Sequence, residues 1–256
     1  MARPADPHAH AALIAAARAE FVKKGLRGAR IEDITAACGL SKGAFYLHYS
    51  SKEALFGEVV AEFSAAMDGL IHQRLGAMER FFAEHGALEA RDVAERSERY
   101  ERLVELNTDA DLRTLELMWA YRDAVHVLMR GSQGTDFESL MWGMVDREVA
   151  RVTQEFQRLQ ADRVSRMDVP PTVIGSLLVG TYLLLAQQMS QMREKPDLAA
   201  WAGSVHRLIR EGSLPPGVHA KKRPAAPAKK RSKTSPRQPP QARALSRTRS
   251  TPRSRP

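Results

Sequence analysis

The chain has 256 residues, of which 43% are hydrophobic, enough for one large domain or two modest ones with a real core. Its single cysteine, Cys38, excludes an internal disulfide framework and a cysteine-rich zinc site. The N-terminal residues show no apolar signal core followed by a cleavage pattern, so we expect a cytoplasmic protein rather than an exported one.

The formal net charge of +9 combines two regions of opposite sign. Residues 213–256 contain 13 of the 39 Lys and Arg and none of the 30 Asp and Glu, which leaves 26 basic and 30 acidic residues in 1–212, a net charge of −4. Residues 1–60 differ from the rest of this acidic part, with 8 basic and 6 acidic residues. The charge therefore predicts a globular region, weakly basic at its start, followed by a strongly basic tail.

Apolar spacing predicts three short helices within the first 50 residues. The first runs from about residue 8 to 24 and Gly25 can close it. The second covers about 31–38, with two acids in its first turn. The third covers about 41–49, because Ser41 is a good N-cap.

The apolar spacing continues to residue 212, and strand patterns and hairpin turns are missing, so the sequence predicts an all-α protein. A Ser-x-x-Glu capping box at Ser50 begins the fourth helix. Asp168 or Asp197 suits a cap near the later helices. The further helices are expected at 51–85, 91–106, 109–130, 136–166, 170–192 and 197–212. The expected breaks between them are the sequences HGALEA, NTDAD, GSQGTD, DVPP and EKPD.

Three regions follow from this pattern: an N-terminal three-helix domain at 1–50, a helical domain at 51–212 and a tail at 213–256. The tail has 9 prolines in 44 residues and is low-complexity. It cannot bury enough apolar surface to offset chain entropy, so we predict that it is disordered.

The expected helix at 41–49 has two different faces. Phe45 and Tyr49 are four residues apart and should face a core, while Lys42 and Tyr46 lie on the opposite face beside Gly43. A cation and a phenol donate hydrogen bonds to anionic oxygens, and the glycine lets another backbone come close. A helix, a tight turn and a second helix with such an outer face is a helix-turn-helix, whose second helix enters the DNA major groove.

The stretch from Gly25 to Phe56 resembles the signature of the tetracycline-repressor-like (TetR) family of regulators. The matching residues, without an insertion, are Gly25, Ile31, Asp33, Ile34, Gly39, Leu40, Ser41, Gly43, Phe45, Tyr46, His48, Tyr49, Ser51, Lys52 and Glu53. The resemblance covers roughly residues 8–60. Beyond them only the length and the helical pattern agree with the family.

The resemblance implies which residues contact DNA. Ser41, Lys42, Tyr46, His48 and Lys52 are expected at the backbone, and Gly43, Ala44 and Leu47 at the groove. Arg30 stands where the family commonly has a capping Thr or Ser, but it can still bind a phosphate bidentately. Ala44 replaces a frequent Thr, which removes one hydroxyl contact. The alternative for Tyr46 and His48 is an ordinary solvated helix face.

For the second domain the resemblance implies a homodimer and a small-molecule effector of unknown identity. The apolar helix at 173–189 and the helix at 197–212 suit a four-helix dimer interface, with a membrane helix as the rival reading. Interface candidates are Leu177, Leu178, Thr181, Leu184, Trp201, Val205 and Leu208. Ligand candidates are Met118, Trp119, Tyr121, Arg122, Met129, Phe137, Met141 and Trp142, with plain core as the alternative.

Three functions compete at this point. The first is a ligand-released repressor that binds a palindromic operator on double-stranded DNA as a dimer. The second is an architectural, nucleoid-associated protein dominated by the basic tail, which attracts phosphates without reading sequence. The third, an enzyme, is disfavoured because the sequence has no nucleophile elbow, phosphate-binding loop, zinc motif or dinucleotide fingerprint. We expect no metal and no cofactor.

Overall fold

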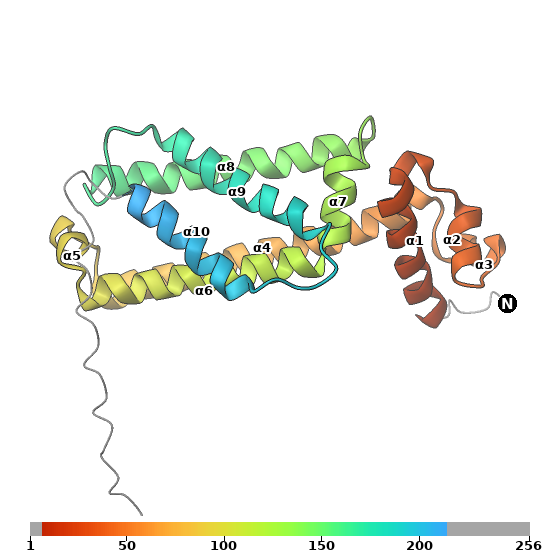
Figure 1. The fold of residues 1–256 in the computed structure, drawn as a ribbon, viewed down its shortest axis with the longest axis horizontal. Coiled ribbons are helices and arrows are strands. Elements are labelled where there is room, and N and C mark those ends of the chain that lie inside the picture. The colour runs from red at the N-terminus through yellow and green to blue at the C-terminus, as the bar shows by residue number, and fades with distance from the viewer. Residues whose placement is uncertain (1–6, 214–256) are drawn as a thin grey trace, which may run out of the picture. The chain divides into compact units, whose positions relative to one another are not determined.

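A computed structural model describes residues 7–213, which form ten helices and no strand (Figure 1). The described part of the chain is therefore all-α, as the sequence predicts. The expected tail lies outside the described residues, apart from Ser213. The helices are α1 (Pro7–Gly28), α2 (Ile31–Ala37), α3 (Lys42–His48), α4 (Lys52–His85), α5 (Ala90–Glu95), α6 (Glu98–Ala120), α7 (Arg122–Arg130), α8 (Asp136–Ala161), α9 (Pro171–Met189) and α10 (Leu198–Ser213).

Local sequence signals account for the ends of the first three helices. Gly25 takes the left-handed conformation (φ 68°), so the regular part of α1 ends there, as expected, before one further turn to Gly28. Gly39 has φ 69° in the turn between α2 and α3. Ser41 caps α3 by accepting a hydrogen bond from the Ala44 amide at 3.1 Å.

The start of α4 differs from the expected one. Ser51, not Ser50, is the N-cap, and its hydroxyl accepts a hydrogen bond from the Ala54 amide at 3.0 Å. The predicted capping box at Ser50 and Glu53 is therefore wrong by one residue. The adjacent serines offer the same capping chemistry, so the sequence alone does not distinguish them.

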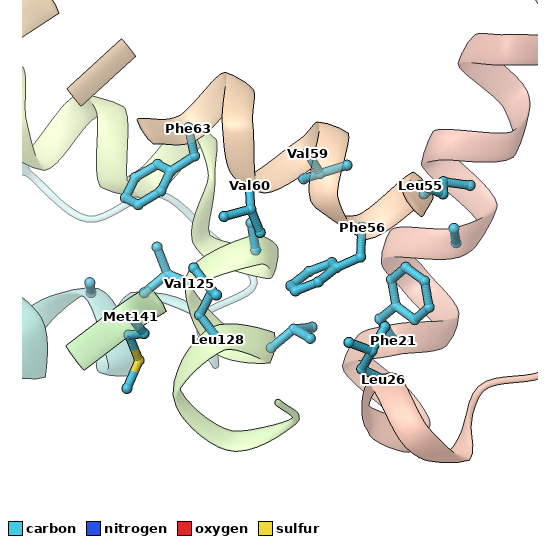
Figure 2. Close-up of a cluster of buried hydrophobic side chains, with 14 of the residues drawn as sticks. Phe21, Leu26, Leu55, Phe56, Val59, Val60, Phe63, Val125, Leu128 and Met141 are labelled. Carbon is cyan, nitrogen blue, oxygen red and sulfur yellow. The ribbon is translucent and has the colours of Figure 1, made fainter. Parts of the chain in front are cut away.

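One hydrophobic core joins α1, the first turns of α4 and α7. Figure 2 shows Phe56 of α4 between Phe21 of α1 and Leu128 of α7. The rings of Phe21 and Phe56 meet edge to face with their centroids 5.4 Å apart. Since all these side chains are buried, a movement of α7 is opposed by direct packing against α1 and α4.

The predicted break at NTDAD is wrong, because α6 runs without interruption from Glu98 to Ala120. Thr108 and Thr114 satisfy their hydroxyls by donating to carbonyls four residues earlier, and Asp111 is buried in a charge network. The breaks occur instead at Arg96, which is left-handed (φ 54°), and at Tyr121. The expected helices at 91–106 and 109–130 are thus α5, α6 and α7.

The last three helices begin close to the expected positions. Pro171 starts α9, and Asp197 caps α10 by accepting a hydrogen bond from the Ala200 amide at 2.9 Å. Asp168 binds Arg166 instead of capping a helix, and α8 ends at Ala161, earlier than predicted. Helix α8 lies beside α9 (Figure 1).

Helix α9 is not buried on all sides within the chain. It has 19 residues, its most apolar window has a mean hydropathy of 1.4, and 33% of that window is buried. This length and composition suit a membrane span, but the core helix of a soluble protein meets the same criteria. Its inner face packs on α8, α7 and α6, while Val173, Leu177 and Leu184 are exposed on one stripe.

Candidate nucleic-acid interface and ligand cavity

The outer face of α3 is exposed, whereas its inner face is in the core. Tyr46 and Leu47 keep 56% and 66% of their surface exposed, although both are large and apolar. Phe45 and Tyr49 are buried, as predicted from their spacing. Exposed large apolar side chains on a helix-turn-helix are suited to contact with base edges and methyl groups in a groove.

A shallow cleft of about 310 Å³ lies between the starts of α2, α3 and α4. Several side chains in its lining can donate hydrogen bonds, and two carboxylates lie among them. The donors are Arg30, Lys42, Tyr46, Ser50, Ser51 and Lys52, and the carboxylates are Glu32 and Glu53. Arg30 is the N-cap residue of α2, makes no side-chain capping bond and is exposed. The arrangement suits a phosphate group, for which cations and hydroxyls are the usual partners.

The two lysines in this cleft have different surroundings. The Lys42 ammonium pairs with Glu32 on α2, which raises the pKa of Lys42. Such an exposed pair is weak, so a phosphate can displace the acid. The Lys52 ammonium donates to the Arg27 and Ala29 carbonyls at 3.0 Å and 2.8 Å, and therefore braces the end of α1.

The remaining predicted DNA residues lie near the same surface. Ser41 and Gly43 are exposed, Ala44 is half-buried, and a side chain at position 43 would meet only the Ser41 hydroxyl, at 3.6 Å. His48 is half-buried, with its ring centroid 5.9 Å from that of His10. The pairing of Glu32 with Lys42 was not predicted, because the spacing of these two residues across the turn carries no local signal.

A second feature is a largely apolar cavity of about 420 Å³ lined by α4, α6, α7, α8 and α9. Met118, Met129 and Met141, three of the residues proposed from the sequence, lie in its wall. The other proposed residues do not line it. Phe137 packs against Phe56, and Trp142 is 49% exposed.

The rest of the proposed ligand cluster forms a separate contact at the junction of α6 and α7. Arg122 donates to the Trp119 carbonyl at 3.0 Å and stacks over the Trp119 ring at 4.3 Å. Tyr121 packs near Phe63 and under Arg18. These residues therefore stabilise the junction rather than face the cavity.

A buried polar network at the cavity was not predicted. Arg74 of α4 donates to Asp111 at 3.2 Å and to Asn107 at 2.8 Å, both on α6. His206 of α10 lies 3.1 Å from the second Asp111 oxygen. Tyr182 of α9 also lines the cavity, and burial with the nearby Asp111 carboxylate raises its pKa. These residues are too far apart in the sequence for a spacing pattern to connect them.

The residues expected at a dimer interface divide into two groups. Leu177, Leu184 and Leu208 are 59%, 63% and 72% exposed. Leu178, Trp201 and Val205 are partly buried against the main core, and Thr181 donates its hydroxyl to the Leu177 carbonyl. The first group therefore presents the larger exposed apolar surface. Among the described residues, no cluster of His, Cys, Asp and Glu is arranged to hold a metal ion.

The first three helices form a helix-turn-helix. Residues 13–59, which include it, match the family described as bacterial regulatory proteins, tetR family. This part of the chain is therefore similar to the DNA-binding domain of the TetR family.

Curated relatives match over short stretches of the chain. The HTH-type transcriptional repressor DhaR of Mycobacterium sp. (strain GP1) is 42% identical over 55 residues, which are 22% of this chain and 28% of DhaR. The uncharacterized regulator YdgC of Bacillus subtilis (strain 168) is 30% identical over 84 residues, 33% of this chain and 39% of YdgC. The chain thus spans well under half of the length of these relatives.

Solved structures agree with the fold over most of the chain. The MbdR regulator from Azoarcus sp. CIB has a TM-score of 0.57 at 16% identity, covering 80% of this chain and 98% of that one. The fatty acid degradation regulator FadR from Bacillus halodurans has a TM-score of 0.52 at 15% identity, covering 79% and 98%. At these identities the likeness concerns the fold alone.

Proposed function

We propose that this protein is a sequence-specific DNA-binding transcriptional regulator that binds a palindromic operator as a dimer and is released by a small molecule. The observation that carries the proposal is the exposed face of α3, where Lys42, Tyr46 and Leu47 stand beside the donor-lined cleft. Helix α3 would enter the major groove and the cleft would hold a backbone phosphate.

Regulation is supported by the path from the cavity to the DNA-binding helices. Val125, Leu128 and Met129 of α7 line the cavity. The C-terminal end of α7 is bonded to α1, since the Leu26 amide donates to the Gly131 carbonyl at 2.9 Å. A ligand that moves α7 would therefore move α1 and α3 with it.

The proposal is tested by replacing Lys42 and Tyr46 together with alanine. An operator is first selected from a pool of random duplexes by the wild-type protein. The double variant should bind it about 100-fold more weakly, since a charge contact and a groove-facing side chain are both lost, while the dimer persists. Affinity is measured by fluorescence anisotropy and mass by light scattering.

Arg91→Ala is the matched control, because this exposed cation on α5 lies outside the proposed interface. It should leave operator affinity unchanged. If the double variant binds the operator as tightly as the wild type, the assignment of α3 to the groove is wrong.

A second candidate is an architectural protein that coats DNA. The observation that favours it is the tail, whose 13 Lys and Arg among 44 residues attract phosphates irrespective of sequence. The two candidates differ in specificity: a regulator prefers its operator over random DNA, whereas a coating protein does not.

A further inference from the structure

The charges around the cavity cancel. Four arginines (Arg74, Arg113, Arg147 and Arg151) and four acids (Asp68, Asp109, Asp111 and Glu148) belong to its lining, so the formal charge of the wall is zero. An ionic ligand in an apolar cavity requires an opposite charge that is not already compensated. The wall therefore has no net charge that would favour an anion over a cation.

The most enclosed of these charges are already paired. Asp111 has a side-chain exposure of 6%, and its two oxygens are engaged by Arg74 and His206. Arg151 lies between Glu148 at 2.6 Å and Glu155 at 3.2 Å. If a charged ligand took the place of one member of such a pair, the other member would be left buried without a counter-charge, which is costly.

The Tyr182 hydroxyl is different, because it is enclosed and has no hydrogen-bonding partner within the described residues. Tyr182 is 8% exposed and lies in the cavity wall. Burial and the nearby Asp111 carboxylate raise its pKa, so it keeps its proton at neutral pH. Because the two Asp111 oxygens are engaged by Arg74 and His206, the hydroxyl can still act as a donor to a ligand. A buried donor without an acceptor is unfavourable, and a ligand oxygen would satisfy it.

The apolar part of the wall is unusually rich in methionine. Met67, Met118, Met129, Met141 and Met144 line the cavity, which is five of the ten methionines in the chain. Methionine side chains adapt their shape and make favourable contacts between sulfur and aromatic rings. Phe63 adds an aromatic ring to the same wall.

We propose that the cavity binds an uncharged, aromatic or similarly flat apolar molecule with an oxygen acceptor that receives a hydrogen bond from the Tyr182 hydroxyl. The inference rests on the proposed function only in that it treats the bound molecule as the effector. Binding itself requires no DNA, so the two are tested separately.

Four naphthalene probes of similar size separate the alternatives. These are 2-acetylnaphthalene (neutral with a carbonyl), 2-ethylnaphthalene (neutral without an acceptor), 2-naphthoate (anion) and 2-naphthylmethylammonium (cation). Titration calorimetry on the full-length protein should show the carbonyl compound binding about fivefold more tightly than 2-ethylnaphthalene, and both charged probes more weakly than either.

Tyr182→Phe removes the hydroxyl and keeps the ring. This variant should bind the carbonyl compound and 2-ethylnaphthalene equally. Tyr100→Phe is the matched control, because Tyr100 is also 8% exposed but lies outside the cavity lining. Its probe preferences should equal those of the wild type. Thermal unfolding of both variants establishes that they fold.

Three results would overturn the proposal: tightest binding of a charged probe, an unchanged carbonyl preference in Tyr182→Phe, or no binding of any neutral probe. Operator affinity is measured on the same preparation. A protein that binds its operator but no neutral probe retains the proposed function and loses this inference. A protein that binds the carbonyl probe through Tyr182 but shows no operator preference retains this inference and loses the proposed function.

Discussion

Lys52 illustrates how a cation in the cleft proposed to hold a phosphate can also have a structural role. Its side chain is 19% exposed, and its ammonium donates to two carbonyls at the C-terminal end of α1. Those carbonyls lack intrahelical partners, so the lysine satisfies them and fixes the start of α4 against α1. The family resemblance alone implies a phosphate contact at this residue, and the structure adds a brace that holds the interface together.

Asp92 has a comparable role at the far end of the second domain. Its buried carboxylate accepts hydrogen bonds from the Glu89 amide, the Ser97 hydroxyl and Arg99, the first two at 2.8 Å. The Arg99 guanidinium is the main reason that the pKa of Asp92 lies well below its usual range. The network joins the start of α5 to the first turn of α6.

We predict that Asp92→Asn lowers the melting temperature at pH 7 by about 5 °C, because the charge-assisted bonds are lost. The depressed pKa means that the stabilisation by Asp92 is complete above about pH 4, the ordinary carboxyl value, and is lost as the pH falls below it. The variant should therefore show a shallower fall in melting temperature from about pH 4 to 2.5.

The control for this prediction is Glu105→Gln, which changes an exposed carboxylate of α6. It should leave both quantities near the wild-type values. Equal melting curves for Asp92→Asn and the wild type at pH 7 would show that the network does not stabilise the fold.

At the scale of the elements, α7 connects the cavity to the DNA-binding helices. It lines the cavity on one side, and at its end Gly131 lies against Gly25 of α1. A Cβ added at Gly131 would lie 3.1 Å from the Gly25 Cα and 3.3 Å from a Val127 methyl group. The two glycines thus permit a close backbone approach that a side chain would obstruct.

We predict that Gly131→Ala separates α7 from α1 and weakens the bond from the Leu26 amide to the Gly131 carbonyl. The expected cost is roughly 1 kcal/mol or more of overpacking, seen as a melting temperature about 3 °C lower. Gly203→Ala in α10 is the control, because a Cβ there meets nothing within 4 Å. A melting temperature for Gly131→Ala at or above that of Gly203→Ala would contradict the close contact.

The sequence predicted the ends of helices best where the residue that caps or stops the helix acts on its own neighbours in the chain. The cap at Ser41, the glycine stop at Gly25 and the cap at Asp197 are all found in the structure. The break at NTDAD failed because Asp111, a polar residue typical of loops, is held inside by Arg74 and His206. Those partners come from α4 and α10, so only the tertiary structure reveals them.

The same limit explains the partial prediction of the cavity. Met118 and Met141 were found because they are apolar residues on central helices, and this pattern equally fits core residues such as Phe137. Arg74 and Tyr182 were missed, because which face of a helix meets a cavity depends on how five helices pack. The residues predicted to contact DNA lie close together in the structure because one short motif contains nearly all of them; their contacts with DNA stay a prediction.

At the scale of the whole molecule, the exposed stripe on α9 is the strongest reason to expect a dimer. Leu177 and Leu184 lie on one face of this helix and are mostly exposed in the single chain. We predict that replacing both with glutamate gives a folded monomer. In the single chain the two carboxylates stay in water, whereas a dimer through this face would bury them without partners. Sedimentation velocity measures the mass.

Operator affinity should fall strongly in this double variant, since one subunit contacts only one half-site. Leu75→Glu, at an exposed position of α4, is the control and should remain dimeric. A double variant with the mass of the wild type would exclude this face of α9 from the interface.

We propose that the helix-turn-helix reads sequence and that the tail only adds affinity. The deciding measurement is the ratio of affinities for the selected operator and for random DNA of equal length at about 0.2 M salt, with and without residues 213–256. We predict a ratio of about 1000 or more in both proteins, with weaker absolute binding and a shallower salt dependence after truncation. A ratio near one in the full-length protein would contradict the account and favour a DNA-coating role.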